Sequence, residues 1–114
     1  MNEDLEGALT AYITLMEEGA YFEAHEVLEA AWHPLRMRKD PLANLLKGLI
    51  NGAIALEHFK RRRGAYRSKA KRVFCSYERH QRLCTEGIVY YPLFQKACNL
   101  LEEVYYISSD KMMH

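Results

Sequence analysis

Apolar side chains recur at intervals of three and four residues along most of the chain, which is typical of helices that bury one face in a core. Residues 3–18 follow this spacing, and Gly19 suits the C-terminal end of a helix. A second helix is predicted over residues 21–33, ending before Pro34, because the residue that precedes a proline disfavours helical geometry. No strand-like alternation of apolar and polar residues persists long enough to compete with these helices.

The third predicted helix runs from about residue 41 to residue 62 and is the most apolar of the chain. Asp40 and Pro41 form a good helix start, with Asp40 as the N-cap and Pro41 at the first helical position. Because apolar residues wrap most of its circumference, we expect this helix to be central and buried. Gly48 and Gly52 would let a neighbouring helix approach it closely.

Two further helices complete the prediction: a basic helix over residues 65–85, and a helix that begins at Pro92 and carries a broad apolar face. The tail from about Ser108 is expected to fray. A length of 114 residues suits one domain. The chain is therefore predicted to be all-α, a single domain over residues 1–114, folded as a compact orthogonal bundle of about five helices with the second helix packed on the third.

The net charge of +1 hides a strong asymmetry along the chain. Residues 1–35 contain eight acidic residues and no Lys or Arg, whereas residues 60–82 contain ten basic residues and one acid, Glu78. A bipolar surface is expected, and the basic helix is where an anionic partner would bind.

Three cysteines, Cys75, Cys84 and Cys98, form neither a CxxC pair nor an even set, which indicates reduced thiols rather than a disulfide framework. The N-terminus lacks the features of a signal peptide. The most apolar run, residues 42–59, is interrupted by polar and charged side chains, so no membrane span is expected. These features together predict a cytoplasmic protein.

The second predicted helix carries the candidate chemistry. His25, Glu29 and Trp32 lie on one stripe of it, because offsets of four and three residues return to nearly the same angle. This stripe adjoins the apolar face, and a partly buried carboxylate needs a partner, for which the nearest imidazole is the first candidate. The third helix offers a matching stripe with Asn51 and His58. If the two helices pack together, these side chains converge on one polar pocket roofed by Trp32.

The same segments resemble the family known as domain of unknown function 309. The resemblance rests on the pattern F-x-A-H-E-x-x-E-x-x-W in residues 22–32, on G-L-I-x-x-A in residues 48–53 and on the Gly-Ala pair at 64–65. It covers roughly residues 5–80 and implies a compact helical bundle, but it implies no activity. Asn51 stands where the family has glutamine, and Arg63 stands where it has asparagine. The resemblance draws attention to His25, Glu26, Glu29 and Trp32.

The leading hypothesis is a small-ligand-binding or interaction module, without a cofactor, whose site comprises His25, Glu29, Trp32, Asn51 and His58. A structural alternative is a hydrogen-bonded junction of the two helices that binds nothing.

An enzymatic alternative is a hydrolase in which a carboxylate and an imidazole act as base and orienting group. A metal-dependent version of this enzyme would hold a divalent ion with a His and a Glu one turn apart and a third ligand from the next helix, whereas a version without metal would use the same residues for acid–base chemistry alone. The residues for this alternative are His25, Glu26, Glu29 and His58.

A further functional alternative, second to the hydrolase, is binding of RNA or DNA through the basic segment 60–82. The pI of the whole chain, about 7.7, is below that of a dedicated nucleic-acid binder. The candidate contacts are Arg61, Arg62, Arg63, Arg67 and Lys71. A homodimer is a further hypothesis on partners, with packing or dimer contacts at Tyr90, Tyr91, Tyr105 and Tyr106.

Overall fold

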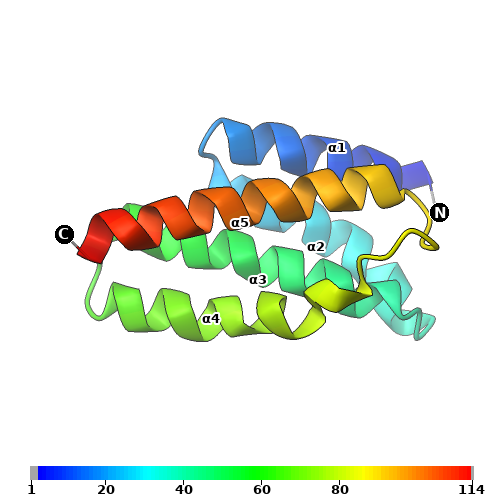
Figure 1. The fold of residues 1–114 in the computed structure, drawn as a ribbon. Coiled ribbons are helices and arrows are strands. Elements are labelled where there is room, and N and C mark those ends of the chain that lie inside the picture. Colours follow the sequence, from blue (N-terminus) through cyan, green and yellow to red (C-terminus); the bar gives the residue numbers. More distant parts are fainter. Residues whose placement is uncertain (1–2, 114) are drawn as a thin grey trace.

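Five α-helices and one short 3₁₀ turn make up the secondary structure of residues 3–113, the part of the chain that the computed structural model describes. No strand occurs within these residues, so the predicted all-α bundle of about five helices is confirmed. The elements are α1 (Glu3–Glu17), α2 (Tyr21–Met37), α3 (Leu42–Arg61), α4 (Tyr66–His80), the 3₁₀ turn η1 (Gln81–Leu83) and α5 (Tyr91–Met113) (Figure 1).

Consecutive helices run in alternating directions along the molecule (Figure 1). At 1.5 Å per residue, α3 with 20 residues and α5 with 23 residues are about 30 and 35 Å long. The molecule measures 43 × 24 × 23 Å, so both helices lie along its longest dimension. The bundle is therefore closer to antiparallel than to the orthogonal arrangement that we expected.

Helix α3 lies at the centre of the bundle, as predicted. Eleven of its residues are buried, and among them Leu45, Leu46, Leu49 and Ile50 are fully buried. It packs against α2, α4 and α5. It also contacts α1, because the buried Tyr12 hydroxyl donates a hydrogen bond to the Leu49 carbonyl oxygen at 2.9 Å. A helix with this many neighbours must be apolar around most of its circumference.

Two glycines set how closely the neighbours approach α3. A Cβ atom on Gly48 would lie 3.1 Å from the Cα of Tyr77 on α4. One on Gly52 would lie 2.3 Å from a methyl group of Leu101 on α5. The expectation of close helix approach at both positions is confirmed, and the structure identifies the partners as α4 and α5.

The predicted end of the second helix was wrong. Helix α2 continues through Pro34 to Met37, although a proline lacks the N–H that would bond to the carbonyl of Ala30. Both Pro34 and Ala30 are exposed, so water can satisfy that carbonyl, while the next residue, Leu35, is buried in the core. Burial of Leu35 therefore keeps the last turn of α2 helical.

The other helix ends differ from the predictions by smaller amounts. Asp40 does cap α3, since its Oδ1 accepts a hydrogen bond from the Leu42 N–H at 2.9 Å, and the helix begins at Leu42. Helix α4 ends at His80 and is extended only by the 3₁₀ turn. Helix α5 continues past Ser108, where a frayed tail was expected, to Met113. None of the helices in residues 3–113 has the length and apolar character needed to cross a membrane.

Candidate binding site between helices α2 and α3

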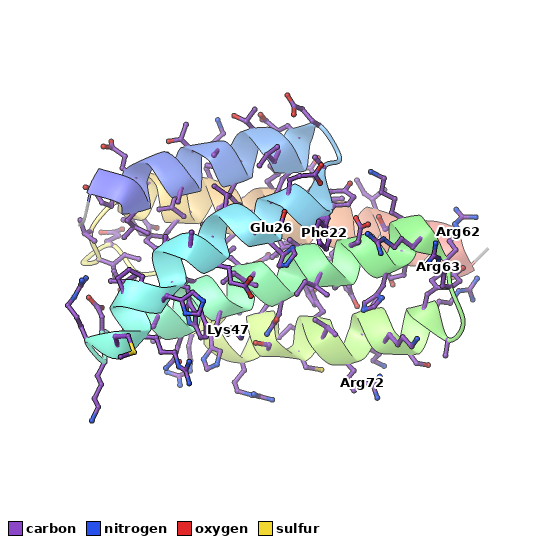
Figure 2. All side chains as sticks on the ribbon, turned by 180° about the vertical axis from the view of Figure 1, so that it is seen from behind. Phe22, Glu26, Lys47, Arg62, Arg63 and Arg72 are labelled. Carbon is purple, nitrogen blue, oxygen red and sulfur yellow. The ribbon has the colours of Figure 1, made fainter. Side chains whose placement is uncertain are left out.

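One stripe of side chains on α2 and one on α3 run beside the junction of the two helices, with Phe22 and Lys47 labelled in Figure 2. Two contacts fix their antiparallel register. The Arg61 guanidinium carbon lies 5.5 Å from the centre of the Phe22 ring, and the Lys47 Nζ lies 4.4 Å from the centre of the Trp32 ring. Positions between these contacts at helical spacing share the same stripe. We call the following ten residues the seam: Phe22, His25, Glu29, Trp32, Arg36, Lys47, Asn51, Ile54, His58 and Arg61.

All five ligand-binding candidates from the sequence belong to the seam and are partly exposed. They do not, however, form one hydrogen-bonded cluster. No hydrogen bond within residues 3–113 joins His25 or Glu29 to Asn51 or His58. The expected polar pocket is therefore a row of partly exposed groups along a surface junction.

His25 is oriented by its own helix. Its Nδ1 forms a hydrogen bond with the carbonyl oxygen of Phe22, and its ring meets the Phe22 ring edge-on, with centres 4.8 Å apart. A carbonyl only accepts, so Nδ1 carries the proton and Nε2 is left to face a ligand. The predicted pairing of His25 with Glu29 is not formed, and Glu29 has no hydrogen-bond or ion-pair partner in the described part of the chain. Glu26 is exposed, about 100° around the helix from His25.

Asn51 and His58 are directed toward α4 rather than α2. The side-chain amide of Asn51 donates a hydrogen bond to the Ser76 hydroxyl at 2.9 Å. The pKa of His58 is lowered, chiefly by partial burial and then by the positive charges of Lys69 and Arg61. The site region therefore spans three helices, with α4 adding positive charge to the face formed by α2 and α3.

Trp32 lies between two cations. Besides Lys47, the Arg36 guanidinium carbon lies 5.1 Å from its ring centre. The ring is partly exposed and packs against the edge of the core rather than inside it. Cations over an indole face are held by the electron-rich ring, so Trp32 positions Lys47 at the seam.

The proposed metal ligands are not gathered into a site. The described residues contain no group of three or more His, Cys, Asp or Glu side chains placed to hold a metal ion. The set formed by His25, Glu29 and His58 is therefore not assembled. The acid–base pair of the hydrolase hypothesis is likewise absent in the form expected, since the Phe22 carbonyl takes the place of Glu29 beside His25.

The basic segment 60–82 continues this face beyond the seam, and all five nucleic-acid candidates in it are exposed. Figure 2 shows Arg62 and Arg63 at the end of α3 and Arg72 on α4. Arg62 ends α3 in a left-handed conformation, φ 53°, with its N–H bonded to the His58 carbonyl at 3.0 Å. Arg61 pairs with Glu57, whereas the other nine of the ten bases in this segment form no ion pair with a described residue.

Sequence reasoning missed three features of this region. Lys47 was not singled out, although its position seven residues before Ile54 places it on the stripe of His58. The exposed ring of Phe22 was noted only as part of a motif. A cavity of about 400 Å³ lies at the C-terminal end of α3, outside the seam. No local pattern could reveal it, because its walls come from separate segments: Glu18, Gly19, Tyr21, Leu56, Phe59, Lys60, Arg62 and Ser108.

Comparison with known proteins adds a family assignment. The family model described as a domain of unknown function (DUF309) matches residues 9–71, which is more than half of the chain. This match includes all of α2 and α3 and the first residues of α4, and thus the whole seam. No curated protein and no solved structure matches the chain.

Proposed function

The chain belongs to the DUF309 family, whose description carries no activity, and we propose from the geometry that it is a binding module for an anionic ligand. The ligand would lie along the seam. The observation that carries this proposal is the excess of positive charge around partly buried polar groups of α3. Lys47 and His58 are partly buried there, and the pKa of His58 is lowered first by this burial and then by the positive charges of Lys69 and Arg61.

Mutual repulsion among these cations is relieved when an anion binds between them. Lys47 supplies a fixed positive charge at one end of the seam, held in place by Trp32. Arg61 lies at the opposite end, beside Phe22, and its charge is partly offset by the Glu57 carboxylate with which it pairs. His58 lies on the stripe between them and would become protonated more easily once an anion is bound. The affinity for an anion should therefore increase as the pH falls.

His25 and Glu29 define which anions fit. The free Nε2 of His25 accepts a hydrogen bond when neutral and donates one when protonated. Glu29 can only accept while ionised, so it favours a ligand that presents a hydroxyl or amino group at that point. A phosphate ester with hydroxyl groups combines both requirements, and we take this as the ligand class.

Titration of the protein with inorganic phosphate and with a nucleoside monophosphate, followed by calorimetry and by thermal melting, tests the proposal. Both ligands should raise the melting temperature near pH 8, where the phosphate group carries its full charge. Lys47→Ala should lose most of this effect. Lys96→Ala is the matched control, because Lys96 is an exposed lysine of α5, outside the seam. A phosphate response that is absent, or unchanged in Lys47→Ala, contradicts the proposal.

A further inference from the structure

Cations and aromatic rings alternate along the face formed by α2, α3 and the start of α4. Three cation–aromatic contacts lie within the seam, and two more lie beside it, at the starts of α2 and α4. The distances from cation to ring centre are 4.4 Å for Lys47 and Trp32, 5.1 Å for Arg36 and Trp32, 5.5 Å for Arg61 and Phe22, 5.8 Å for Lys60 and Tyr21, and 5.9 Å for Arg67 and Tyr66.

We propose that the ligand of the seam is a single-stranded nucleic acid, bound with its phosphates on the basic residues and an unpaired base against the exposed ring of Phe22. This inference rests on the proposed anion-binding function and names its partner. Surfaces that bind single strands without sequence preference combine a positively charged track with aromatic side chains on which bases stack. Both components are present on this one face.

The geometry suits a strand several nucleotides long. Phe22 and Trp32 are ten residues apart on α2, which corresponds to about 15 Å of helix. Stacked nucleotides follow one another at about 3.4 Å along a strand, so this distance accommodates several of them. Beyond Phe22, Arg62 and Arg63 extend the positive charge around the end of α3, and Arg72 extends it across α4 (Figure 2).

The aromatic rings favour a single strand over other polyanions. Phe22 is 44% exposed although it is large and apolar, and an unpaired base stacked on it would cover that surface. A duplex keeps its bases stacked inside and could use only the positive charge. Glu26, which is exposed on α2, borders the seam on the side away from α4 (Figure 2). Its negative charge repels phosphates and so favours a strand that lies toward α4.

Fluorescence anisotropy with a labelled uridine oligonucleotide of about 12 residues tests the inference, since one binding fold covers about 4–16 nucleotides. If about four phosphates are contacted, raising the salt concentration from about 50 to 200 mM should weaken binding roughly 50-fold. Phe22→Ala should weaken binding about tenfold, because stacking on one ring is lost. Val89→Ala, which alters another exposed apolar side chain far along the sequence from the seam, is the control and should bind normally.

A charge-reversal pair separates phosphate contacts from net charge. Arg63→Glu should reduce the slope of log affinity against log salt concentration by the amount expected for about one phosphate contact. Lys96→Glu makes the same change in charge on α5 and should leave this slope unchanged. Circular dichroism confirms that each variant is folded. Equal affinity for the single strand and for a duplex of the same length, or no effect of Phe22→Ala, overturns the inference.

The outcome also distinguishes this inference from the proposal on which it rests. If inorganic phosphate stabilises the protein in a Lys47-dependent way but the oligonucleotide binds no more tightly than phosphate, the anion site stands and the nucleic-acid ligand is wrong. If neither ligand binds, both are wrong.

Discussion

The ammonium group of Lys47 lies 4.4 Å from the centre of the Trp32 ring, and this contact joins α3 to α2 at the surface of the bundle. A buried tryptophan would be a packing residue, and an isolated lysine would extend into solvent. Here the indole gives the lysine a defined position, and the lysine covers part of the exposed ring. The pair is thus both a tertiary contact and the fixed positive charge of the candidate site.

Replacing Lys47 by methionine separates these two roles. The apolar stem still covers Trp32, so the free energy of unfolding should fall by no more than about 1 kcal/mol, the value of an exposed cation–aromatic contact. Phosphate-dependent stabilisation should nevertheless disappear. Urea denaturation with and without phosphate measures both effects. A loss of stability of several kcal/mol would instead show that the lysine is mainly structural.

Gly52→Ala should destabilise the bundle by roughly 1–3 kcal/mol, because the new Cβ would lie 2.3 Å from a methyl group of the fully buried Leu101, whose side chain would have to shift within the packed core. Gly7→Ala is the matched control within a helix. No atom lies within 4 Å of a Cβ at Gly7, so the gain in helix propensity should stabilise the protein by about 0.5–1 kcal/mol. Denaturant unfolding of the two variants should shift in opposite directions, and similar shifts would contradict the packing at Gly52.

The stability of the protein should depend on His58 below neutral pH. Partial burial and the charges of Lys69 and Arg61 lower the pKa of His58 in the folded state, so the unfolded chain binds a proton more readily. Stability is therefore fully present above the unfolded pKa of about 6.5 and decreases as the pH falls through it. His58→Gln should flatten this dependence when unfolding is measured near pH 8 and pH 5.5 in a buffer without phosphate. An unchanged pH dependence would argue against the charged surroundings of His58.

The three cysteines should differ in reactivity. Cys75 is exposed, Cys84 is partly buried, and Cys98 is buried, and burial raises the pKa of the Cys98 thiol to about 12. Because the thiolate is the reactive form, iodoacetamide near pH 8 should modify Cys75 first and Cys98 only after unfolding. Peptide mass spectrometry follows the order directly. Modification of Cys98 as fast as Cys75 in the native protein would contradict the packing of α5.

Local sequence determined which residues share a helix and which of them share a face. The spacing of His25, Glu29 and Trp32 placed them on one stripe of α2, and the spacing of Asn51 and His58 did the same on α3, because helical periodicity depends only on the residues in between. Asp40 marked the start of α3 for a similarly local reason, since a cap acts within one turn. The all-α bundle and the central place of α3 followed from the same periodic pattern.

Only the tertiary structure decided which neighbour each stripe faces. Gly48 lets α4 approach α3, and Asn51, three residues on, consequently bonds to Ser76 of α4 instead of a group on α2. The turn after Pro34 depended in the same way on the burial of Leu35, which outweighed the local preference against helix. Packing energies accumulate over contacts between distant segments, whereas propensities act within a turn. The polar segment of α2 was therefore visible in the sequence, but its positively charged surroundings arose from the packing of α3 and α4 beside it.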